Sequence, residues 1–226
     1  DWIAGYVFIA PVTIGLFVFY IWPFIQNFWF SFNDVNKFNV THFIGLENYR
    51  RLFSDKEVFQ TFGNTLKYVI VTVPVGLFLS LVTAALLNSK IKGKSLYRTL
   101  YFLPSVTMAA AVAMVWKWVF NEKMGILNAL ITSFGGPRIG WLTNPKTAIF
   151  VVMLVGLWMS VGYNMIILLA GMQGINKSYY EAAEIDGAGP LTQFFKITVP
   201  LLTPTIFFFF FFPPLSAAFR SLMWSI

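Results

Sequence analysis

Five long runs without a charged residue constrain what this chain can fold into more than any other feature. A helix needs about 20 mostly apolar residues to cross the hydrocarbon core of a membrane, and each run is close to that length or longer. The runs cover residues 2–33, 68–89, 99–116, 147–176 and 197–219. We therefore predict an all-α, polytopic transmembrane helical bundle that forms a single domain over residues 1–226. The predicted spans lie at about 3–30, 64–88, 99–121, 147–172 and 197–219.

The composition excludes an ordinary soluble fold. Of the 226 residues, 58% are hydrophobic and 11% are charged, against about 45–50% and 25% in soluble domains. So little charge cannot cover an exterior that faces water. The first run is too long for the core of a signal peptide, so we expect a spanning helix with a further tail before it. Aromatic side chains gather near the predicted span ends, as at a lipid–water boundary, and these include Tyr97, Tyr101, Trp116, Trp118 and Trp141.

The distribution of charge indicates a lipid membrane as a partner and argues against nucleic acid. Cysteine and histidine, which often bind metals, are almost absent. The formal charge is +7, but the Lys and Arg residues separate the apolar runs and form no patch. The chain has no cysteine, which excludes disulfides and thiolate metal sites. Its one histidine, His42, stands alone in a polar loop, so we expect no metal site.

The loop at residues 90–98 sets the predicted orientation. It has four cations and no acid, which indicates a cytoplasmic loop. The loops 34–60 and 121–146 then lie outside, while the loop 173–199 and residue 1 lie in the cytoplasm. The loop 173–199 has two lysines against three acids, so its placement depends on the first basic loop.

The last run contains six consecutive phenylalanines, Phe207–Phe212, followed by Pro213 and Pro214. A proline pair there ends a helix after about a dozen residues, which is too short to cross a membrane. Two interpretations remain open at this point. Either the chain bends there, or the sequence joins pieces that are not contiguous in the natural protein.

The polar segment before the last run has strong signals for local structure. Ser178 and Glu181 are spaced as a capping box, which predicts a short helix that begins at Tyr179. The glycines within Gly187–Pro190 favour backbone angles that end this helix, and the proline suits the first turn of another. We expect two short helices at an angle, projecting from the membrane. The alternative is a simple solvated hairpin between two spans.

This segment resembles the EAA loop of permease subunits in binding-protein-dependent ABC importers. The matching positions are Glu181-Ala182-Ala183, Asp186-Gly187-Ala188, Ile197 and Pro200. Most of the chain resembles the maltose, glycerol-phosphate and oligosaccharide branch of that family. Further matching stretches are Trp22-Pro23, Ser31-Phe32, 45–49, Asn64-Thr65, 98–104, 125–128 and 169–173. The resemblance implies a type I importer permease fold with six core helices, of which five are visible here.

The resemblance also implies roles and partners. In the family the loop is a coupling helix that docks on the ATPase subunit, and Glu181 would contact a basic residue there. The positions carried over are Tyr179, Tyr180, Glu181, Ala182, Ala183, Asp186, Gly187 and Ala188. ATP and Mg²⁺ would bind to partner subunits and no cofactor to this chain. The expected partners are a second homologous permease, two ATPase subunits and an extracytoplasmic solute-binding protein, in a bacterial or archaeal plasma (inner) membrane.

The fourth run contains the candidate cargo contacts, Trp158, Ser160, Tyr163 and Asn164. Aromatic rings beside a few polar groups suit the C–H faces and hydroxyls of a sugar. In the resembled family, sugar contacts come from this helix, about 18 to 21 residues before the EAA glutamate, where Tyr163 and Ser160 fall. The alternative is that the glycine and serine here only allow close packing of helices.

Other sequence features indicate a non-catalytic translocation subunit. Gly93-Lys94-Ser95 lacks the glycine five positions earlier that a phosphate-binding loop needs, since Asn88 stands there. No Ser-His-Asp set or carboxylate pair is visible, and the middles of the first four predicted spans are uncharged, which argues against ion coupling and a charged cargo. We predict ATP-driven import of a carbohydrate. Three alternatives stay open: import of glycerol phosphate or a polyol, an ion-coupled secondary transporter, and a membrane-embedded enzyme.

Overall fold

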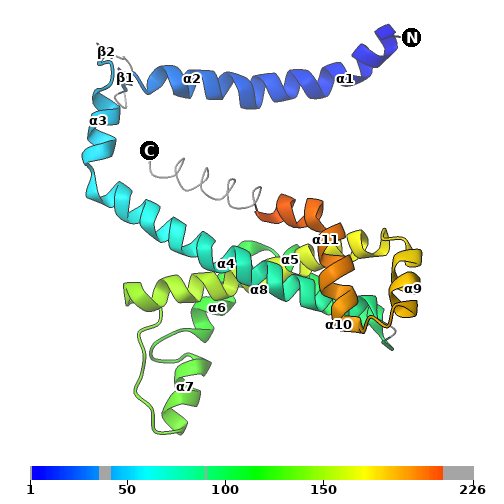
Figure 1. Ribbon diagram of the computed structural model, residues 1–226. Coiled ribbons are helices and arrows are strands. Elements are labelled where there is room, and N and C mark those ends of the chain that lie inside the picture. Colours follow the sequence, from blue (N-terminus) through cyan, green and yellow to red (C-terminus); the bar gives the residue numbers. More distant parts are fainter. Residues whose placement is uncertain (1, 36–41, 90, 211–226) are drawn as a thin grey trace. The chain divides into compact units, whose positions relative to one another are not determined.

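A computed structural model describes residues 2–35, 42–89 and 91–210 (Figure 1). The chain divides into two compact units, Asp1–Phe62 and Gly63–Ile226. The predicted all-α class is confirmed, because the only strands among the described residues are two residues long each. Three described helices are long and apolar enough to cross a membrane, and two bent helix pairs bring the number to as many as five. The single domain over residues 1–226 stays a prediction.

The first unit begins with a helical rod over Trp2–Phe30, none of whose most apolar stretch is buried. A widened turn interrupts the rod just before Pro23, with the Trp22 N–H donating to the Phe17 carbonyl five residues earlier. Proline lacks an N–H and its ring clashes with the carbonyl four residues before it, so the backbone opens into a π-turn there. The elements of this unit are α1 Trp2–Leu16, η1 Phe17–Ile21, α2 Trp22–Phe30, β1 Asn33–Asp34, β2 His42–Phe43 and α3 Glu47–Ser54.

The predicted loop 34–60 has a defined structure at both ends. Strands β1 and β2 pair antiparallel. The Asn48 amide donates to the carbonyls of Ser31 and Asn33, both at 3.0 Å, and the Tyr49 hydroxyl lies 2.7 Å from that of Ser31. Residues 31–32 and 45–49 were two separate stretches of the family resemblance, and the structure brings them together as one hydrogen-bonded clasp.

The second unit is built on the long helices α4 and α8, each of which has a polar cap at its start. Asp55 accepts a hydrogen bond from the Glu57 amide, so α4 begins eight residues before the predicted span. Asn144 caps α8 in the same way. The elements here are α4 Lys56–Asn88 (which begins in the first unit), α5 Lys94–Val106, α6 Ala109–Val119, α7 Ile126–Ser133, α8 Pro145–Gln173, α9 Lys177–Ile185, α10 Pro190–Gln193, η2 Phe194–Thr198, α11 Val199–Leu201 and a helix over Thr203–Phe210.

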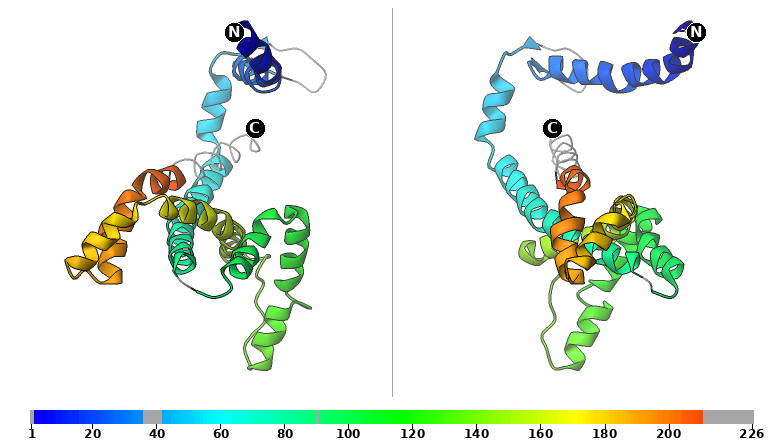
Figure 2. Two further views of the ribbon diagram at one scale, coloured as in Figure 1. Left: turned by 90° about the vertical axis from the view of Figure 1, so that its right-hand side faces the viewer. Right: turned by 45° about the vertical axis from the view of Figure 1, so that its right-hand side comes forward.

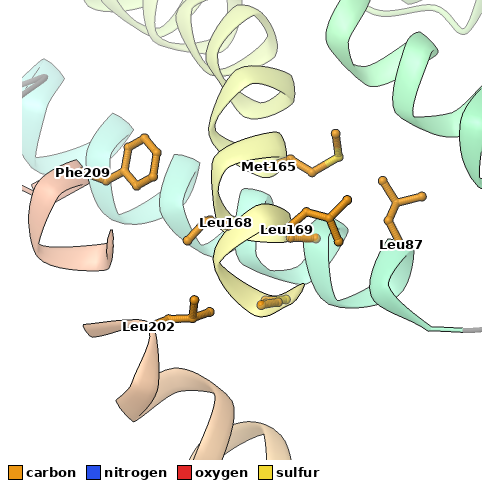
Figure 3. Packing of buried hydrophobic residues seen from close by; sticks show 8 residues of the cluster. Leu87, Met165, Leu168, Leu169, Leu202 and Phe209 are labelled. Atoms are coloured by element: carbon orange, nitrogen blue, oxygen red, sulfur yellow. The ribbon is translucent and has the colours of Figure 1, made fainter. Parts of the chain in front are cut away.

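The core of the second unit lies where α4, α8 and the last described helices meet (Figure 3). Its buried side chains include Leu87, Met165, Leu168, Leu169, Leu202 and Phe209. A buried hydroxyl also joins two of the helices, because Ser80 on α4 donates to its own helix at Gly76 and lies 3.3 Å from the Val161 carbonyl of α8. Apolar packing therefore holds α4 and α8 together, and the Ser80 hydroxyl adds a polar contact between them.

The third predicted span, 99–121, is not one straight helix. Helices α5 and α6 meet at 95°, and the chain is extended at Thr107 and Met108 between them. Pro104 lies in the last turn of α5 and cannot donate a backbone hydrogen bond there, which weakens the end of the helix. The last span also bends, by 66° between Pro190–Leu201 and Thr203–Phe210. The predicted remainder of that span, residues 211–219, lies outside the described residues, as does the Pro213-Pro214 pair.

The predicted outer loop 121–146 is organised around one buried side chain. Asn128 on α7 is 2% exposed. Its amide nitrogen donates to the carbonyls of Glu122 and Ile139, and its oxygen accepts from the Ile139 amide and the Trp141 indole. Gly125 allows the chain to turn tightly before α7, since a Cβ there would overlap backbone atoms of Asn121. The Gly125–Asn128 stretch of the resemblance thus shapes this loop.

We expect Asn128→Ala to loosen this loop without unfolding the spans. Alanine leaves the Ile139 amide and the Trp141 indole without a buried acceptor, which costs about 2 kcal/mol locally. The Ile139 amide should then exchange with deuterium roughly 30-fold faster, because exchange follows the free energy of local opening. Hydrogen exchange read by mass spectrometry checks this. Ser133→Ala, an exposed change in the same loop, should leave the exchange rate unchanged. Equal rates in both variants would show that the Asn128 hydrogen bonds do not hold this loop.

Candidate coupling loop and cargo cavity

Helix α9 begins at Lys177, two residues before the predicted start. Its cap is Asn176, whose side-chain oxygen accepts from the Ser178 amide at 3.1 Å. The predicted capping box of Ser178 and Glu181 is wrong. Ser178 lies inside the helix, and its N–H, which Glu181 would have to reach, already donates to Asn176.

The other end of α9 matches the prediction from its glycines. Gly187 has a left-handed backbone (φ 74°), and its N–H donates to the Glu184 carbonyl while that of Ala188 donates to Ala183. This pair of bonds is a Schellman motif, which satisfies carbonyls at a helix end. Pro190 then occupies the first turn of α10. The two predicted short helices are confirmed.

One face of α9 is open, and we call it the α9 face. It comprises Tyr179, Glu181, Ala182 and Ile185, all exposed, with Ile185 87% exposed. In the part of the chain that the structure describes, the one ion pair joins Arg51 to Glu47, so the carboxylates of Glu181, Glu184 and Asp186 have no cationic partner. The α9 face therefore presents an apolar side chain and a carboxylate that makes no ion pair within the described part of the chain.

Tyr180 points away from the α9 face. It lies about 200° around the helix from Ala182, is partly buried, and places its hydroxyl 2.8 Å from that of Thr198 on η2. Gln193 on α10 reaches back to the Ala188 carbonyl at 3.0 Å. The structure therefore places Tyr180 opposite the α9 face. Ala183, which is partly buried and lies about 60° around the helix from Tyr180, is on the same inward side.

A cavity of about 730 Å³ lies among α4, α5, α6 and α8. It is lined by Val71, Leu79, Tyr97, Leu100, Tyr101, Pro104, Trp116, Phe150, Met153, Leu154, Leu157, Trp158, Val161 and Gly162. None of these side chains is charged, and five are aromatic. Trp158 and Trp116 meet edge to face with their ring centroids 5.5 Å apart. The cavity is thus a partly open, uncharged pocket with an aromatic wall.

The structure does not bring the four predicted cargo contacts together. Trp158 lines the cavity, but Tyr163, 55% exposed, lies about 140° further around α8. Ser160 donates to the Leu157 carbonyl at 3.2 Å and lies near Gly76 of α4, as the packing alternative predicted. Asn164 is partly buried and does not line the cavity.

Sequence reasoning missed the cavity's other aromatic residues. Tyr97, Tyr101 and Trp116 lie near the predicted span ends, where the sequence predicts interfacial rings. The bend between α5 and α6 directs them into the cavity wall instead. The signal available in the sequence was Pro104, which marks the end of α5.

The two loops at the ends of α8 lie far apart. Figure 2 shows α7 and α9 at different ends of the second unit. The 29 residues of α8 between them extend over about 43 Å at 1.5 Å per residue, which exceeds the roughly 30 Å of a hydrocarbon core. This geometry agrees with the predicted placement of loops 121–146 and 173–199 on opposite sides of a membrane.

Comparisons with known proteins agree on one family. The profile of the binding-protein-dependent transport system inner membrane component matches residues 59–222. The chain is 39% identical over 220 residues to the probable ABC transporter permease protein YesP of Bacillus subtilis (strain 168), covering 96% of this chain and 71% of that protein. It is 35% identical over 205 residues to the sn-glycerol-3-phosphate transport system permease protein UgpA of Escherichia coli O157:H7, covering 89% and 68%.

The fold also has a match among solved structures. A bacterial ABC transporter involved in the import of the acidic polysaccharide alginate contains a chain that superposes with a TM-score of 0.79 at 24% identity, covering 91% of this chain and 70% of that one. At that identity the likeness concerns the arrangement of helices, and it supports the predicted importer permease fold.

Proposed function

This chain belongs to the inner membrane components of binding-protein-dependent transport systems, and we propose that it is the permease subunit of an ATP-driven importer with a carbohydrate as cargo. Its membership of the family confirms the resemblance predicted from the EAA-like loop. The proposed assembly contains a second homologous permease, two ATPase subunits and a soluble receptor outside a bacterial plasma membrane.

The α9 face is the observation on which this proposal depends. Asn176 caps one end of α9 and a Schellman motif closes the other, so both ends of the helix are well defined. Its outward side chains, an isoleucine and an unpaired glutamate among them, suit a partner with an apolar cleft and a basic residue. We propose that this partner is the ATPase. Asp186, Gly187 and Ala188 belong to the same docking segment, because they set where α9 ends.

We assign ATP and Mg²⁺ to the ATPase subunits. The Gly93-Lys94-Ser95 sequence joins two helices, α4 and α5, whereas a phosphate-binding loop of this type follows a strand. In the proposed cycle, closure of the ATPase dimer moves α9, and the attached spans change the access of the cavity from one side of the membrane to the other.

The uncharged aromatic cavity supports a neutral sugar as the cargo. Rings such as Trp158 and Trp116 can stack on the C–H faces of a sugar, and the absence of charge from the lining offers nothing to a phosphate. The second candidate cargo is glycerol phosphate, which the 35% identity to UgpA favours. The roles of Tyr163, Ser160 and Asn164 stay predictions.

Uptake by the complete transporter in proteoliposomes tests the function. We expect ATP-dependent accumulation of a neutral oligosaccharide that the soluble receptor binds, and no accumulation without the ATPase. Selective uptake of sn-glycerol 3-phosphate would contradict the neutral sugar as cargo but would leave the proposed ATP-driven importer unchanged. Uptake driven by an ion gradient without the ATPase would contradict the proposed function.

We expect Trp158→Ala to weaken uptake while the assembly stays intact. Loss of a stacking ring costs about 1.4 kcal/mol, which is roughly a tenfold rise in the sugar concentration for half-maximal uptake. The rate of uptake against sugar concentration measures this. Trp118→Ala is the matched control, because Trp118 is exposed and does not line the cavity. Equal effects of the two changes would argue against the cavity as the cargo site.

A further inference from the structure

Tyr180 begins a short relay of hydrogen bonds that connects α9 to the core of the second unit. Its hydroxyl lies 2.8 Å from the Thr198 hydroxyl, and Thr198 in turn lies 3.5 Å from the Gln193 carbonyl as donor. One assignment of protons satisfies both contacts. The Tyr180 hydroxyl donates to the Thr198 hydroxyl, which itself donates over the longer distance to the Gln193 carbonyl. Thr198 is 6% exposed, so little water competes for this hydrogen bond.

The relay continues from Thr198 into the packed helices. The Thr198 carbonyl accepts from the Leu202 amide at 3.0 Å, and Leu202 is buried in the core cluster with Met165 and Leu168 of α8. Figure 3 shows Leu202 in this cluster. The path from α9 to the core therefore crosses one side-chain hydrogen bond and one helical turn.

The covalent path between α9 and η2 is less direct. It runs through residues 186–189, where Gly187 has a left-handed backbone and Gly189 an extended one. Glycines permit many backbone angles, so a push on α9 can be absorbed by rotation in this turn. The Tyr180–Thr198 hydrogen bond bypasses the turn, and the Gln193 bond to Ala188 restrains it.

We propose that Tyr180 is a positioning residue that transmits the movement of α9 to the spans through Thr198, and that it does not contact the ATPase. This inference rests on the proposed function, in which α9 docks on an ATPase. It assigns the two faces of α9 to separate tasks: the α9 face binds the partner, and Tyr180 on the opposite side transmits the movement.

A single introduced cysteine can test this, because the chain has none of its own. Leu157→Cys places a reporter in the cavity wall, and its reaction with N-ethylmaleimide is followed on this chain in the assembled transporter, without nucleotide and with ATP plus vanadate. We call the Leu157→Cys chain without further changes the reporter chain, and we expect ATP to change its labelling rate. Tyr180→Phe and Thr198→Val should each reduce this ATP-dependent change by roughly fivefold, the usual effect of one lost hydrogen bond, while the ATPase still co-purifies.

Three comparisons separate transmission from a general structural role. Thr198→Ser keeps the hydroxyl and should restore the ATP response. The double change of Tyr180→Phe with Thr198→Val should be no worse than either single change, because both remove the same bond. Thr203→Val, an exposed change in the next helical segment, should respond like the reporter chain.

The outcomes distinguish this inference from the proposed function. A full ATP response in Tyr180→Phe, or additive losses in the double variant, would overturn the inference alone. Weakened co-purification of the ATPase by Tyr180→Phe would also overturn it, since Tyr180 would then belong to the docking surface. Failure of any ATPase to co-purify with the unaltered chain would overturn the proposed function and this inference with it.

Discussion

Gly162→Ala is expected to prevent stable assembly of the second unit. A Cβ at Gly162 on α8 would overlap the Tyr101 carbonyl oxygen of α5 and come within 3.0 Å of the Phe102 Cα. Both obstacles are backbone atoms, which cannot move aside as the end of a side chain can. Separating α5 from α8 also opens the cavity, because both helices line it. We expect a loss of about 3 kcal/mol or more, at the upper end for overpacking in a core.

Thermal unfolding of the detergent-solubilised chain measures this loss, and size-exclusion profiles report assembly. Gly63→Ala is the control, since a Cβ there meets nothing within 4 Å and lies within helix α4. It should be neutral or slightly stabilising, because alanine favours helix over glycine by about 1 kcal/mol. A Gly162→Ala chain that unfolds at the temperature of the Gly63→Ala chain would show that α5 and α8 do not pack this closely.

The long helices could be predicted because membrane spans depend on length and absence of charge alone. The runs at 2–33, 68–89 and 147–176 each became one helical rod. Their true ends depend on single polar caps, such as Asp55 before α4, which a count of apolar residues does not see. The start of α4 was therefore placed eight residues late.

Breaks within the apolar runs were the hardest features to predict. Pro23 and Pro200 each follow a π-turn in which the residue before the proline donates to the carbonyl five positions back. The prolines can be read from the sequence, but a membrane helix can accommodate a proline with a kink, with a π-turn or without a visible distortion. Pro104 ends α5 near a 95° bend, and the choice among these outcomes depends on neighbouring helices.

The candidate site was predicted where local chemistry decides the backbone and missed where packing decides it. Gly187 ends α9 because its left-handed angle is strained for other residues. The predicted start of α9 is wrong because Asn176 and Ser178 are both good N-cap residues, and the sequence does not show which of them lies just before the helix. The inward side of Tyr180 depends on Thr198, 18 residues later, and no local pattern shows that contact.

Glu181→Lys is expected to abolish uptake while the chain still inserts and folds. Glu181 is exposed on the α9 face and has no cationic partner among the described residues, so its loss leaves internal contacts unchanged. Reversal of its charge replaces attraction to a basic residue on the ATPase by repulsion, at a cost of about 3 kcal/mol or more in docking. ATP-dependent uptake should fall more than about 100-fold, and the ATPase should dissociate during purification. Glu57→Lys makes the same charge change on an exposed part of α4 and should leave both unaffected. Normal uptake by Glu181→Lys would contradict the assignment of the α9 face to the ATPase, because a docked surface cannot tolerate a buried like-charge contact at its centre.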